Sequence, residues 1–410
     1  MKRTLIILLA AVFAFASSQK AGACSSVIIP AKYTVSGKAL MVKIRDQSAE
    51  AQNSNIQHFT GPKYKFLGYV PKTKRPHDKV QSLVGGMNEA GLCFMSLTSK
   101  CFQLDSTMAR PHGGGSLQFD ALGRCRNIKE FDALLDEWGA PLGAMCNIGV
   151  IDAEGGAAYY EFNGVWYTKY DVNDPAVAPD GWMVMTNFAW SGHGGGGFDR
   201  HSAATLTMKQ FKKNADGKYD ITPKDLYQAF GRSYANGYAG ITSLSDIEQY
   251  DYFSVKGFMY HNTTCGMLTF ESVPVGEDPK RCVLWTQLGY PVVSPAIPMV
   301  VSPRSTIPSY IYKEDFEMPD VFKYSYKLRD KYIFNLMEQD SRSFTYFSIK
   351  GVKECVARTA VVEDFISKSF AEIYDKWVAG KLSDKEFYRA YAEVTPSFYE
   401  AYLKEYPQAD

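Results

Sequence analysis

Ala21-Gly22-Ala23-Cys24-Ser25-Ser26-Val27-Ile28-Ile29 is the stretch that decides how this chain folds, because a cysteine follows small residues and opens an apolar run. Upstream, Lys2 and Arg3 precede the apolar residues 5–16. A basic start, a short apolar run and small residues at its end are typical of a secretory signal that is cleaved off. We therefore predict that residues 1–23 are a signal peptide and that the exported chain, periplasmic or extracellular, begins with Cys24.

Two chemistries fit a leading cysteine. In the first, Cys24 is a nucleophile whose own α-amine is the base; a thiol titrates near ~8.5 and an α-amine near ~8, so both work close to neutral pH. In the second, Cys24 is lipidated and anchors a surface binding protein, and its acylated amine could not accept a proton. Lipidation signals have a larger aliphatic residue where this chain has Ala21. The sequence favours the nucleophile and keeps the lipoprotein as its alternative.

Composition and charge narrow the range of partners. Lys and Arg number 45 against 44 Asp and Glu, with no polybasic run, so we expect no nucleic-acid binding. With 46% hydrophobic residues the chain can bury a large core. Beyond the leader, no stretch approaches the roughly 20 apolar residues of a membrane span, so no stable membrane insertion is expected. A small-molecule substrate fits best, and the oligomeric state is left open, a homo-oligomer included.

Hydrophobic periodicity predicts an α+β chain. Strands are expected at 25–29 and 39–44, at 80–84 and 92–97 around a glycine-rich turn at 85–91, and at 147–151, 157–162, 165–170, 182–188, 265–270 and 282–288. Helices are expected at 128–138, at 202–212 and, after Thr222 as N-cap, at 223–234. Strand groups with intervening helices predict two stacked sheets covered by helices.

The proline-rich passage 291–308 indicates a domain boundary or a segment that wraps around the first domain. We predict a first domain over 24–305 and a mainly helical C-terminal extension over 306–410, with helices at 352–382 and 384–406. Whether this extension packs on the same domain is left open.

Cysteines and histidines give weaker indications. Of the eight cysteines, Cys265 and Cys282 in neighbouring predicted strands are the best candidates for a disulfide, although buried free thiols are the commoner state. His112, His193 and His201 lie near glycine-rich stretches but lack metal-ligand spacing, so no metal and no cofactor are expected. A Cys–His hydrolase that uses an internal cysteine such as Cys93 is a further alternative. The run 194–197 predicts a flexible surface loop or lid loop.

Several motifs resemble a known superfamily. The opening at Cys24, the turn at 36–38 and the segment Lys43-Ile44-Arg45-Asp46 resemble the start of N-terminal-nucleophile (Ntn) amide hydrolases. Similar groups are the choloylglycine hydrolases, penicillin V acylases, isopenicillin-N acyltransferases and cysteine dipeptidases, and the spacing from Cys24 to Asp46 looks most like the dipeptidases. Residues 86–92, 184–187 and 288–295 resemble further motifs in the same order. The resemblance spans roughly residues 24–300.

The resemblance implies a four-layer αββα Ntn sandwich with Cys24 at the start of a central strand. It implies a hydrolase of linear amide C–N bonds that works through a thioester acyl-enzyme without a cofactor. Asp46 matches the carboxylate that holds the α-amine, and Asn187 matches the side-chain donor of the oxyanion hole. Such preorganised donors contribute ~3 to 4 kcal/mol to transition-state stabilisation.

Other matches are partial. Lys43 stands where these families have arginine, which keeps the charge but loses the planar fork. Thr98 stands where choloylglycine hydrolases carry asparagine, so its backbone amide is the expected donor, and Arg200 matches a further site arginine. The acyl group stays open among N-acyl amino acids, bile salts, penicillin-type amides and small peptides. The choice between hydrolase and acyltransferase stays open too.

Overall fold

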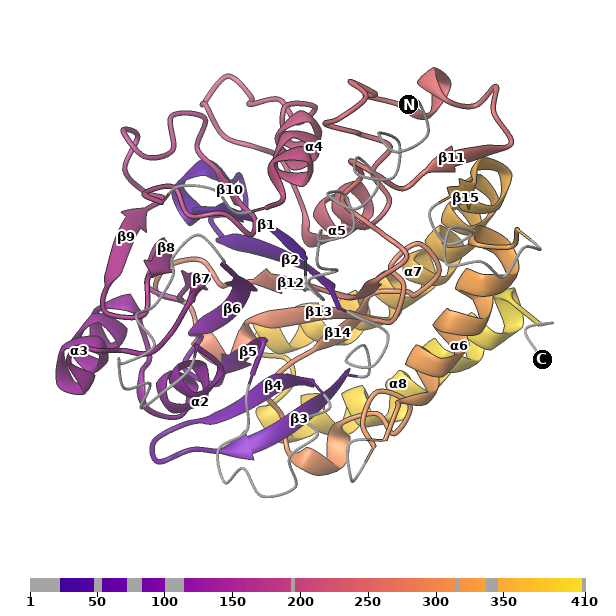
Figure 1. Ribbon diagram of the computed structural model, residues 1–410. Helices are drawn as coiled ribbons and strands as arrows, with labels where there is room; N and C mark the ends of the chain where they lie inside the picture. The colour runs from indigo at the N-terminus through magenta and orange to yellow at the C-terminus, as the bar shows by residue number, and fades with distance from the viewer. Residues whose placement is uncertain are drawn as a thin grey trace, which may run out of the picture.

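The computed structural model describes residues 23–47, 54–71, 83–99, 114–192, 196–313, 317–336 and 346–407. Residues 1–22, which are the predicted signal peptide without its last residue, lie outside the described residues. Two large antiparallel sheets form the centre of the molecule (Figure 1). Within the described residues, no helix combines the length and the apolar content that crossing a membrane requires.

The six-stranded sheet carries Cys24. In sheet order its strands are β10 (Met183–Met185), β1 (Cys24–Ile29), β2 (Leu40–Asp46), β12 (Thr264–Glu271), β13 (Val283–Leu288) and β14 (Ile297–Met299). Every residue of β1 and of β2 is buried, as expected of central strands covered on both faces.

The seven-stranded sheet is a meander in chain order. Its strands are β3 (Ser54–Thr60), β4 (Lys65–Pro71), β5 (Gly85–Asn88), β6 (Cys93–Thr98), β7 (Cys146–Ile151), β8 (Ala157–Phe162) and β9 (Tyr167–Asp171). The two sheets face each other, and the hydroxyls of Ser26 on β1 and Tyr159 on β8 lie 2.9 Å apart between them.

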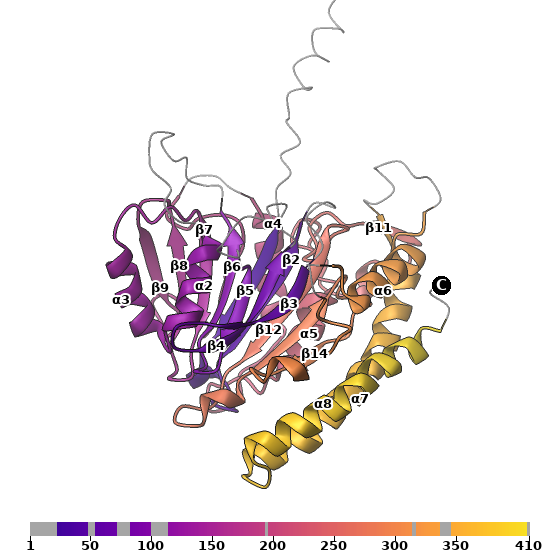
Figure 2. The ribbon, with the colours of Figure 1, turned by 90° about the horizontal axis from the view of Figure 1, so that it is seen from below.

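Helices cover both outer faces and complete four layers. Helices α2 (Gly114–Arg124) and α3 (Ile128–Trp138) pack on the seven-stranded sheet through an apolar cluster that includes Leu117, Phe131 and Tyr160. Helices α4 (Phe198–Met208) and α5 (Pro223–Gly231) contact the six-stranded sheet. Figure 2 shows α2 and α3 on the flank opposite to the C-terminal helices. The predicted α+β sandwich is confirmed.

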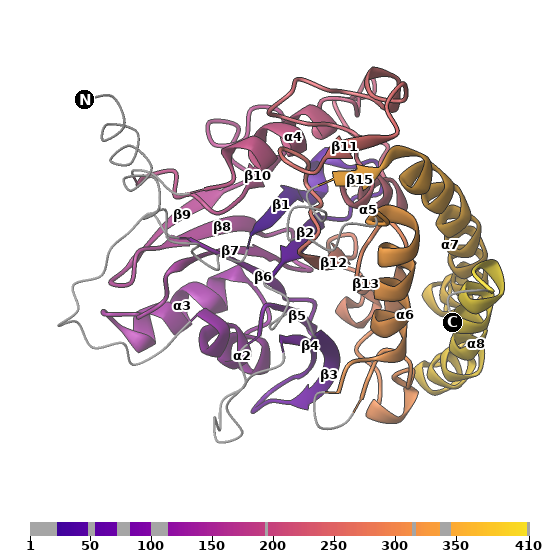
Figure 3. The same ribbon diagram turned by 45° about the vertical axis from the view of Figure 1, so that its right-hand side comes forward.

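The C-terminal part continues on the six-stranded sheet. Helices α6 (Asp320–Leu328), α7 (Ile349–Val378) and α8 (Asp384–Glu405) lie along its flank (Figure 3), and their apolar side chains belong to the same core cluster as β1 and β2. A small sheet of β11 (Tyr252–Ser254) and β15 (Tyr346–Ser348) lies beside them. Short turns of helix are η1 (Ala31–Tyr33), η3 (Leu244–Asp246), η4 (Pro279–Arg281), η5 (Arg304–Thr306) and η7 (Arg329–Ile333).

The predicted glycine-rich turn at 85–91 is wrong at its start, because Gly85 and Gly86 belong to strand β5. A Cβ atom on Gly86 would lie 2.5 Å from the Leu67 carbonyl oxygen, and one on Gly85 would lie 2.8 Å from Leu268 Cδ1. The glycines therefore allow close packing rather than a turn. Of the strand expected at 80–84, residues 80–82 lie outside the described residues.

The predicted Cys265–Cys282 disulfide is also wrong: both cysteines are free and buried. The antiparallel register of β12 and β13 pairs Gly266 with Leu288 and Glu271 with Val283, so the two cysteines lie at opposite ends of the strand pair. Because the two strands are antiparallel and each cysteine lies near the start of its strand, the two thiols are far apart.

Candidate active site

Cys24 begins β1, between β10 and β2, and is 5% exposed. Its main-chain N–H donates to Asn187 Oδ1 at 2.7 Å. Cys24 is paired directly with Arg45 on β2, so the two side chains share a face of the sheet. The nitrogen atom that signal removal would convert into an amine therefore already has a side-chain acceptor.

Asn187, two residues after β10, connects the two sheets. Its Nδ2 donates to the carbonyl oxygen of Thr98, at the end of β6, at 2.6 Å. The main chain on either side of Asn187 is held by buried Asn147 on β7, whose Nδ2 donates to the carbonyls of Thr186 at 3.0 Å and Phe188 at 2.8 Å. Nothing in the sequence pattern pointed to Asn147, because its contacts join distant parts of the chain.

Arg200 reaches the same place from α4. Its Nη2 donates to Asn187 Oδ1 at 2.8 Å, and its Nη1 donates to Ser25 Oγ at 3.1 Å and to the Cys24 carbonyl. Gly197, the N-cap of α4, has φ +89°, and a Cβ there would lie 2.5 Å from Arg200 Nη2. Glycine at 197 therefore leaves room for the buried guanidinium. The sequence had indicated only a loop at 194–197 and had given Gly197 no role beside Arg200.

Asp46 ends β2 on the face opposite to Arg45. Its main-chain N–H donates to the Ala23 carbonyl at 2.7 Å, and its Oδ1 accepts from the Thr264 hydroxyl. Its Oδ2 is excluded from solvent and has no hydrogen-bond partner among the described residues. Burial raises the pKa of Asp46, while His261, Arg200 and the Thr264 hydrogen bond oppose that rise.

Lys43 is buried on the same face of β2 as Arg45. Its Nζ donates to the Val84 carbonyl at 2.6 Å and to the Ser96 carbonyl. Burial lowers its pKa to about 8, and the nearby Cys24 thiol opposes that fall. In the described residues Lys43 binds main-chain oxygens and joins the two sheets beside Cys24.

The structure thus brings Cys24, Thr98, Asn187 and Arg200 into one hydrogen-bonded network, with Lys43 and Asp46 on the adjacent strand β2. Arg45 lies among them and was not singled out by the sequence; its Nη1 donates to Ser54 Oγ at 2.8 Å and to Cys265 Sγ at 2.9 Å.

The alternative residues lie elsewhere or outside the description. Burial raises the pKa of the Cys93 thiol well above its ordinary value, which disfavours it as a nucleophile. His201 packs edge-on against the rings of Phe188 and Trp190. His112 and His193 lie outside the described residues, and among the described ones no three potential metal ligands are gathered together.

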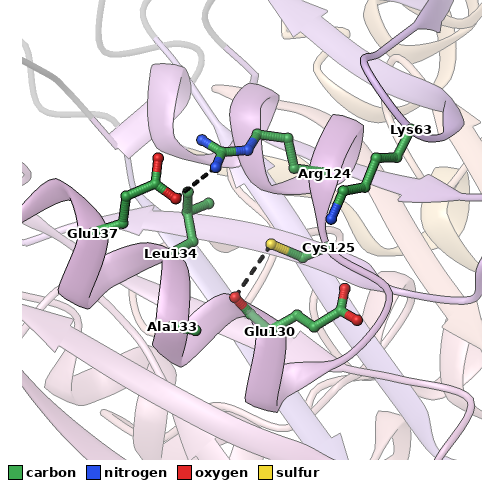
Figure 4. A pocket seen from close by; sticks show the side chains of 7 residues that line it. All are labelled: Lys63, Arg124, Cys125, Glu130, Ala133, Leu134 and Glu137. Carbon is green, nitrogen blue, oxygen red and sulfur yellow. Dashed lines mark hydrogen bonds and ion pairs between the residues drawn. The ribbon is translucent and has the colours of Figure 1, made fainter.

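A surface cavity of about 250 Å³ lies far from Cys24, between α2 and α3 on the outer face of the second sheet. Figure 4 shows Arg124 turned towards Glu137, at 2.6 Å, and the Cys125 thiol turned towards the Glu130 carbonyl. The side chains of Arg124, Glu137 and Cys125 are bonded within this lining, and no residue of the Cys24 network lines the cavity.

No protein-family model and no curated protein matches the chain. Among solved structures, a penicillin V acylase from Agrobacterium tumefaciens is similar at 14% identity and TM-score 0.36, over 68% of this chain and 86% of that one. An N-acylethanolamine-hydrolyzing acid amidase ortholog from Caenorhabditis elegans is similar at 13% identity and TM-score 0.37, over 62% and 95%. A mutant conjugated bile acid hydrolase from Clostridium perfringens is similar at 13% identity and TM-score 0.34, over 65% and 89%. These likenesses are too weak to assign a residue role or a substrate.

Proposed function

We propose that the mature chain is an exported cysteine amidase that hydrolyses a linear amide C–N bond through a thioester on Cys24. The observation that carries the proposal is the hydrogen bond from the Cys24 nitrogen to Asn187 Oδ1, at 2.7 Å, inside a network that Arg200 completes. A side chain that fixes this nitrogen also fixes the direction of an α-amine lone pair. Such a site needs no histidine and no metal to activate the thiol.

The reaction follows from the groups around Cys24. The α-amine takes the thiol proton, the sulfur attacks the carbonyl carbon, and a tetrahedral oxyanion forms. The protonated amine then gives its proton to the leaving nitrogen, the C–N bond breaks, and the acyl group stays on sulfur. Water, deprotonated by the same amine, attacks the carbonyl carbon of the thioester. The C–S bond then breaks, the acid leaves, and the protonated amine returns its proton to the Cys24 sulfur. The buried side chain of Asp46 is placed to accept a hydrogen bond from the α-amine while the amine is protonated.

The oxyanion donors that we propose are the Thr98 main-chain N–H and the Asn187 side chain. The Ser96 N–H donates to the Val84 carbonyl at 3.1 Å. In an antiparallel strand the N–H and C=O groups of every second residue point to the same edge, so those of Ser96 and Thr98 point to the same edge of β6. Thr98, two residues on, turns its carbonyl to Asn187 and is expected to turn its N–H the same way. Asn187 Nδ2 has a second hydrogen beyond the one that Thr98 accepts.

The test starts with the full chain expressed in a host that exports it, followed by N-terminal analysis and intact mass. We expect Cys24 to be the first residue, with a free amine. A panel of N-acyl amino acids, bile-salt conjugates, penicillin V and dipeptides then identifies an amide that is cleaved. With that amide, Cys24→Ala should lose activity by at least about a thousandfold, and quenched wild type should carry the acyl mass on Cys24.

The matched control is Cys93→Ala, which removes a buried thiol that lies outside the Cys24 network and should keep the activity. A diacylglyceryl group and an acylated amine on Cys24 would instead establish the lipid-anchored binding protein. Activity that survives in Cys24→Ala and is lost in Cys93→Ala would establish the internal-cysteine hydrolase.

A further inference from the structure

We infer that Phe188, Trp190 and Phe198 form an aromatic subsite beside Cys24 that binds a flat apolar group of the amide substrate. The inference rests on the proposed function and deepens it, because it names the chemistry of one substituent of the amide. The three rings come from the segment after β10 and from the start of α4. These two segments also carry the side chains that bind Cys24.

Two of the rings are the most exposed of their kind. Trp190 is 50% exposed and Phe198 is 56% exposed, more than any other tryptophan or phenylalanine in the described part of the chain. Phe188 is nearly buried and contacts both, with ring centroids 4.5 Å from Phe198 and 5.9 Å from Trp190. Scattered exposed apolar side chains need no explanation, but a contiguous group is typical of a binding site.

This aromatic surface begins one residue from the group that holds the Cys24 nitrogen. Asn187 accepts the Cys24 N–H at 2.7 Å, and Phe188 follows it directly in the chain. Asn187 also forms an antiparallel bridge with Gly196, two residues before Phe198, so the two segments meet beside the site. Neighbouring Cα atoms are about 3.8 Å apart, so a substituent a few bonds long is expected to reach the rings from an amide bound at Cys24.

A buried carboxylate holds the main chain that carries Trp190. Glu161 on β8 is almost completely buried, and its Oε2 accepts the N–H of Trp190 at 2.5 Å and the N–H of Ser191 at 3.3 Å. The Ser191 hydroxyl donates to the other carboxylate oxygen. A buried carboxylate is costly unless several donors bind it, and here the donors are all in this short segment or on the adjacent strand β9. The position of Trp190 is therefore fixed from within the second sheet.

The residue paired with Glu161 holds the preceding part of the same segment. Asn147 lies directly opposite Glu161 across β7 and β8, and its Nδ2 donates to the carbonyls of Thr186 and Phe188. The main chain over 186–191 is thus bound at both ends. A ring on an ordered main chain loses less conformational freedom on binding a ligand than a ring on a mobile loop. Exposed rings on a segment held in this way are preorganised for binding.

Flat apolar groups suit this surface best. Its rings offer stacking and the burial of apolar area. The neighbouring imidazole of His201 packs edge-on against Phe188 and Trp190, and burial lowers its pKa, so it adds no charge near neutral pH. The bound group belongs either to the acyl part or to the leaving amine, since both extend from the scissile amide, and the two are separated by experiment.

Two matched pairs of amides test the subsite. N-phenylacetylglycine against N-acetylglycine varies the acyl part, and N-acetylphenylalanine against N-acetylalanine varies the leaving amine. We expect wild type to prefer the aromatic member of one pair by about tenfold or more in kcat/KM, and Trp190→Ala and Phe198→Ala to bring this ratio close to unity. The pair that responds identifies the part of the substrate that the rings bind.

The ratio within a pair cancels any general damage to catalysis. Trp166→Ala is the matched control, because Trp166 is also exposed and stacks on Tyr167, which packs against the apolar cluster of α2 and α3. This variant should keep both the ratio and the activity of wild type. Glu161→Gln keeps the size of the side chain but replaces one acceptor oxygen by an amide group, so the ratio should fall because Trp190 is held less firmly.

Calorimetric titration of the same four amides separates the subsite from the proposed function. Preferred binding of an aromatic amide that Trp190→Ala loses, in a protein that cleaves none of them, keeps the subsite and removes the proposed function. No aromatic preference in either measurement, or a preference that Trp190→Ala and Phe198→Ala both keep, overturns the inference. An unchanged ratio together with a smaller oligomer in Trp190→Ala, measured by sedimentation, also overturns it and assigns the rings to a contact between copies of this chain.

Discussion

Lys43 is a charged residue that the fold buries at a cost. Its pKa is about 8 in the folded chain against 10.5 for a free lysine, mainly because of burial. Between these pH values the unfolded chain binds more protons than the folded chain, so the free energy of unfolding rises with pH across this window. Below pH 8 the buried ammonium costs about 3 kcal/mol. Under the proposed function, this charge lies beside the sulfur atom that becomes a thiolate.

The pH dependence of Lys43 gives a prediction at this same scale. As pH rises through about 8, Lys43 loses its positive charge, so kcat/KM should fall on the alkaline side. Lys43→Arg keeps the charge at every working pH and should move this alkaline limb beyond about pH 10. The control is Lys38→Arg, at a partly exposed ion pair with Glu271, which should keep the wild-type profile. A limb that stays near pH 8 in Lys43→Arg would assign it to another group.

Single residues also mark the limit of prediction from sequence. Cys24, Asn187 and Arg200 could be singled out because local motifs carry them, and the structure brings them together. Thr264 could not, because its hydrogen bond to Asp46 arises from the pairing of β12 with β2, which no local pattern contains. The same holds for Asn147, whose two acceptors lie 39 and 41 residues further along the chain.

At the level of helices and strands, elements with a clear period were predictable. The helix expected at 128–138 is α3 at those bounds, and Thr222 caps α5 with Asp225 in a capping box. Strand β5 was missed because its glycines serve close packing. Strands β3 and β4 and helices α2 and α6 were not predicted; α2 opens with Gly114 and Gly115, which favour loops in isolation and are overruled here by packing on β4–β6.

The contact between β7 and the segment after β10 gives a prediction about elements. Asn147→Ala leaves the carbonyls of Thr186 and Phe188 without their donor, so stability should fall by about 2 kcal/mol. Because Asn187 lies between these carbonyls, kcat/KM should fall by roughly ten- to a hundredfold. Denaturant unfolding and steady-state kinetics measure the two effects.

Asn88 offers a matched control, because its Nδ2 likewise donates to two carbonyls, of Leu122 at 2.8 Å and Cys125 at 2.7 Å, far from Cys24. Asn88→Ala also loses the hydrogen bonds that Asn88 Oδ1 accepts from the Ala90 N–H at 3.1 Å and the Leu92 N–H at 2.9 Å, so this variant should be destabilised at least as much and keep kcat/KM. Equal kinetic losses in both variants would mean that general loosening, and not the position of Asn187, sets the activity.

For the whole molecule, one buried ion pair joins the C-terminal helices to the sandwich. Arg232, directly after α5, forms two hydrogen bonds of 2.6 Å with Glu363 on α7, and both side chains are almost completely buried. Glu363 also accepts the Ala296 main-chain N–H at 3.1 Å, inside the proline-rich passage. The proline-rich passage 291–308 is thus hydrogen-bonded to α7. Apolar side chains of α7 and α8 lie in the same core cluster as those of β1 and β2.

This connection predicts that the described sandwich and the C-terminal helices unfold together. Glu363→Ala leaves a buried arginine unpaired and should lower the free energy of unfolding by about 3 to 5 kcal/mol, whereas Arg232→Met with Glu363→Leu should recover most of it. The adjacent Asp364→Ala, which removes an exposed ion pair with Lys224, should change stability by less than about 1 kcal/mol. Far-ultraviolet circular dichroism and tryptophan fluorescence should report one shared transition in each variant. If Glu363→Ala melts helical signal first and leaves a folded, active sandwich, the C-terminal helices are a separate unit and the buried pair does not couple them.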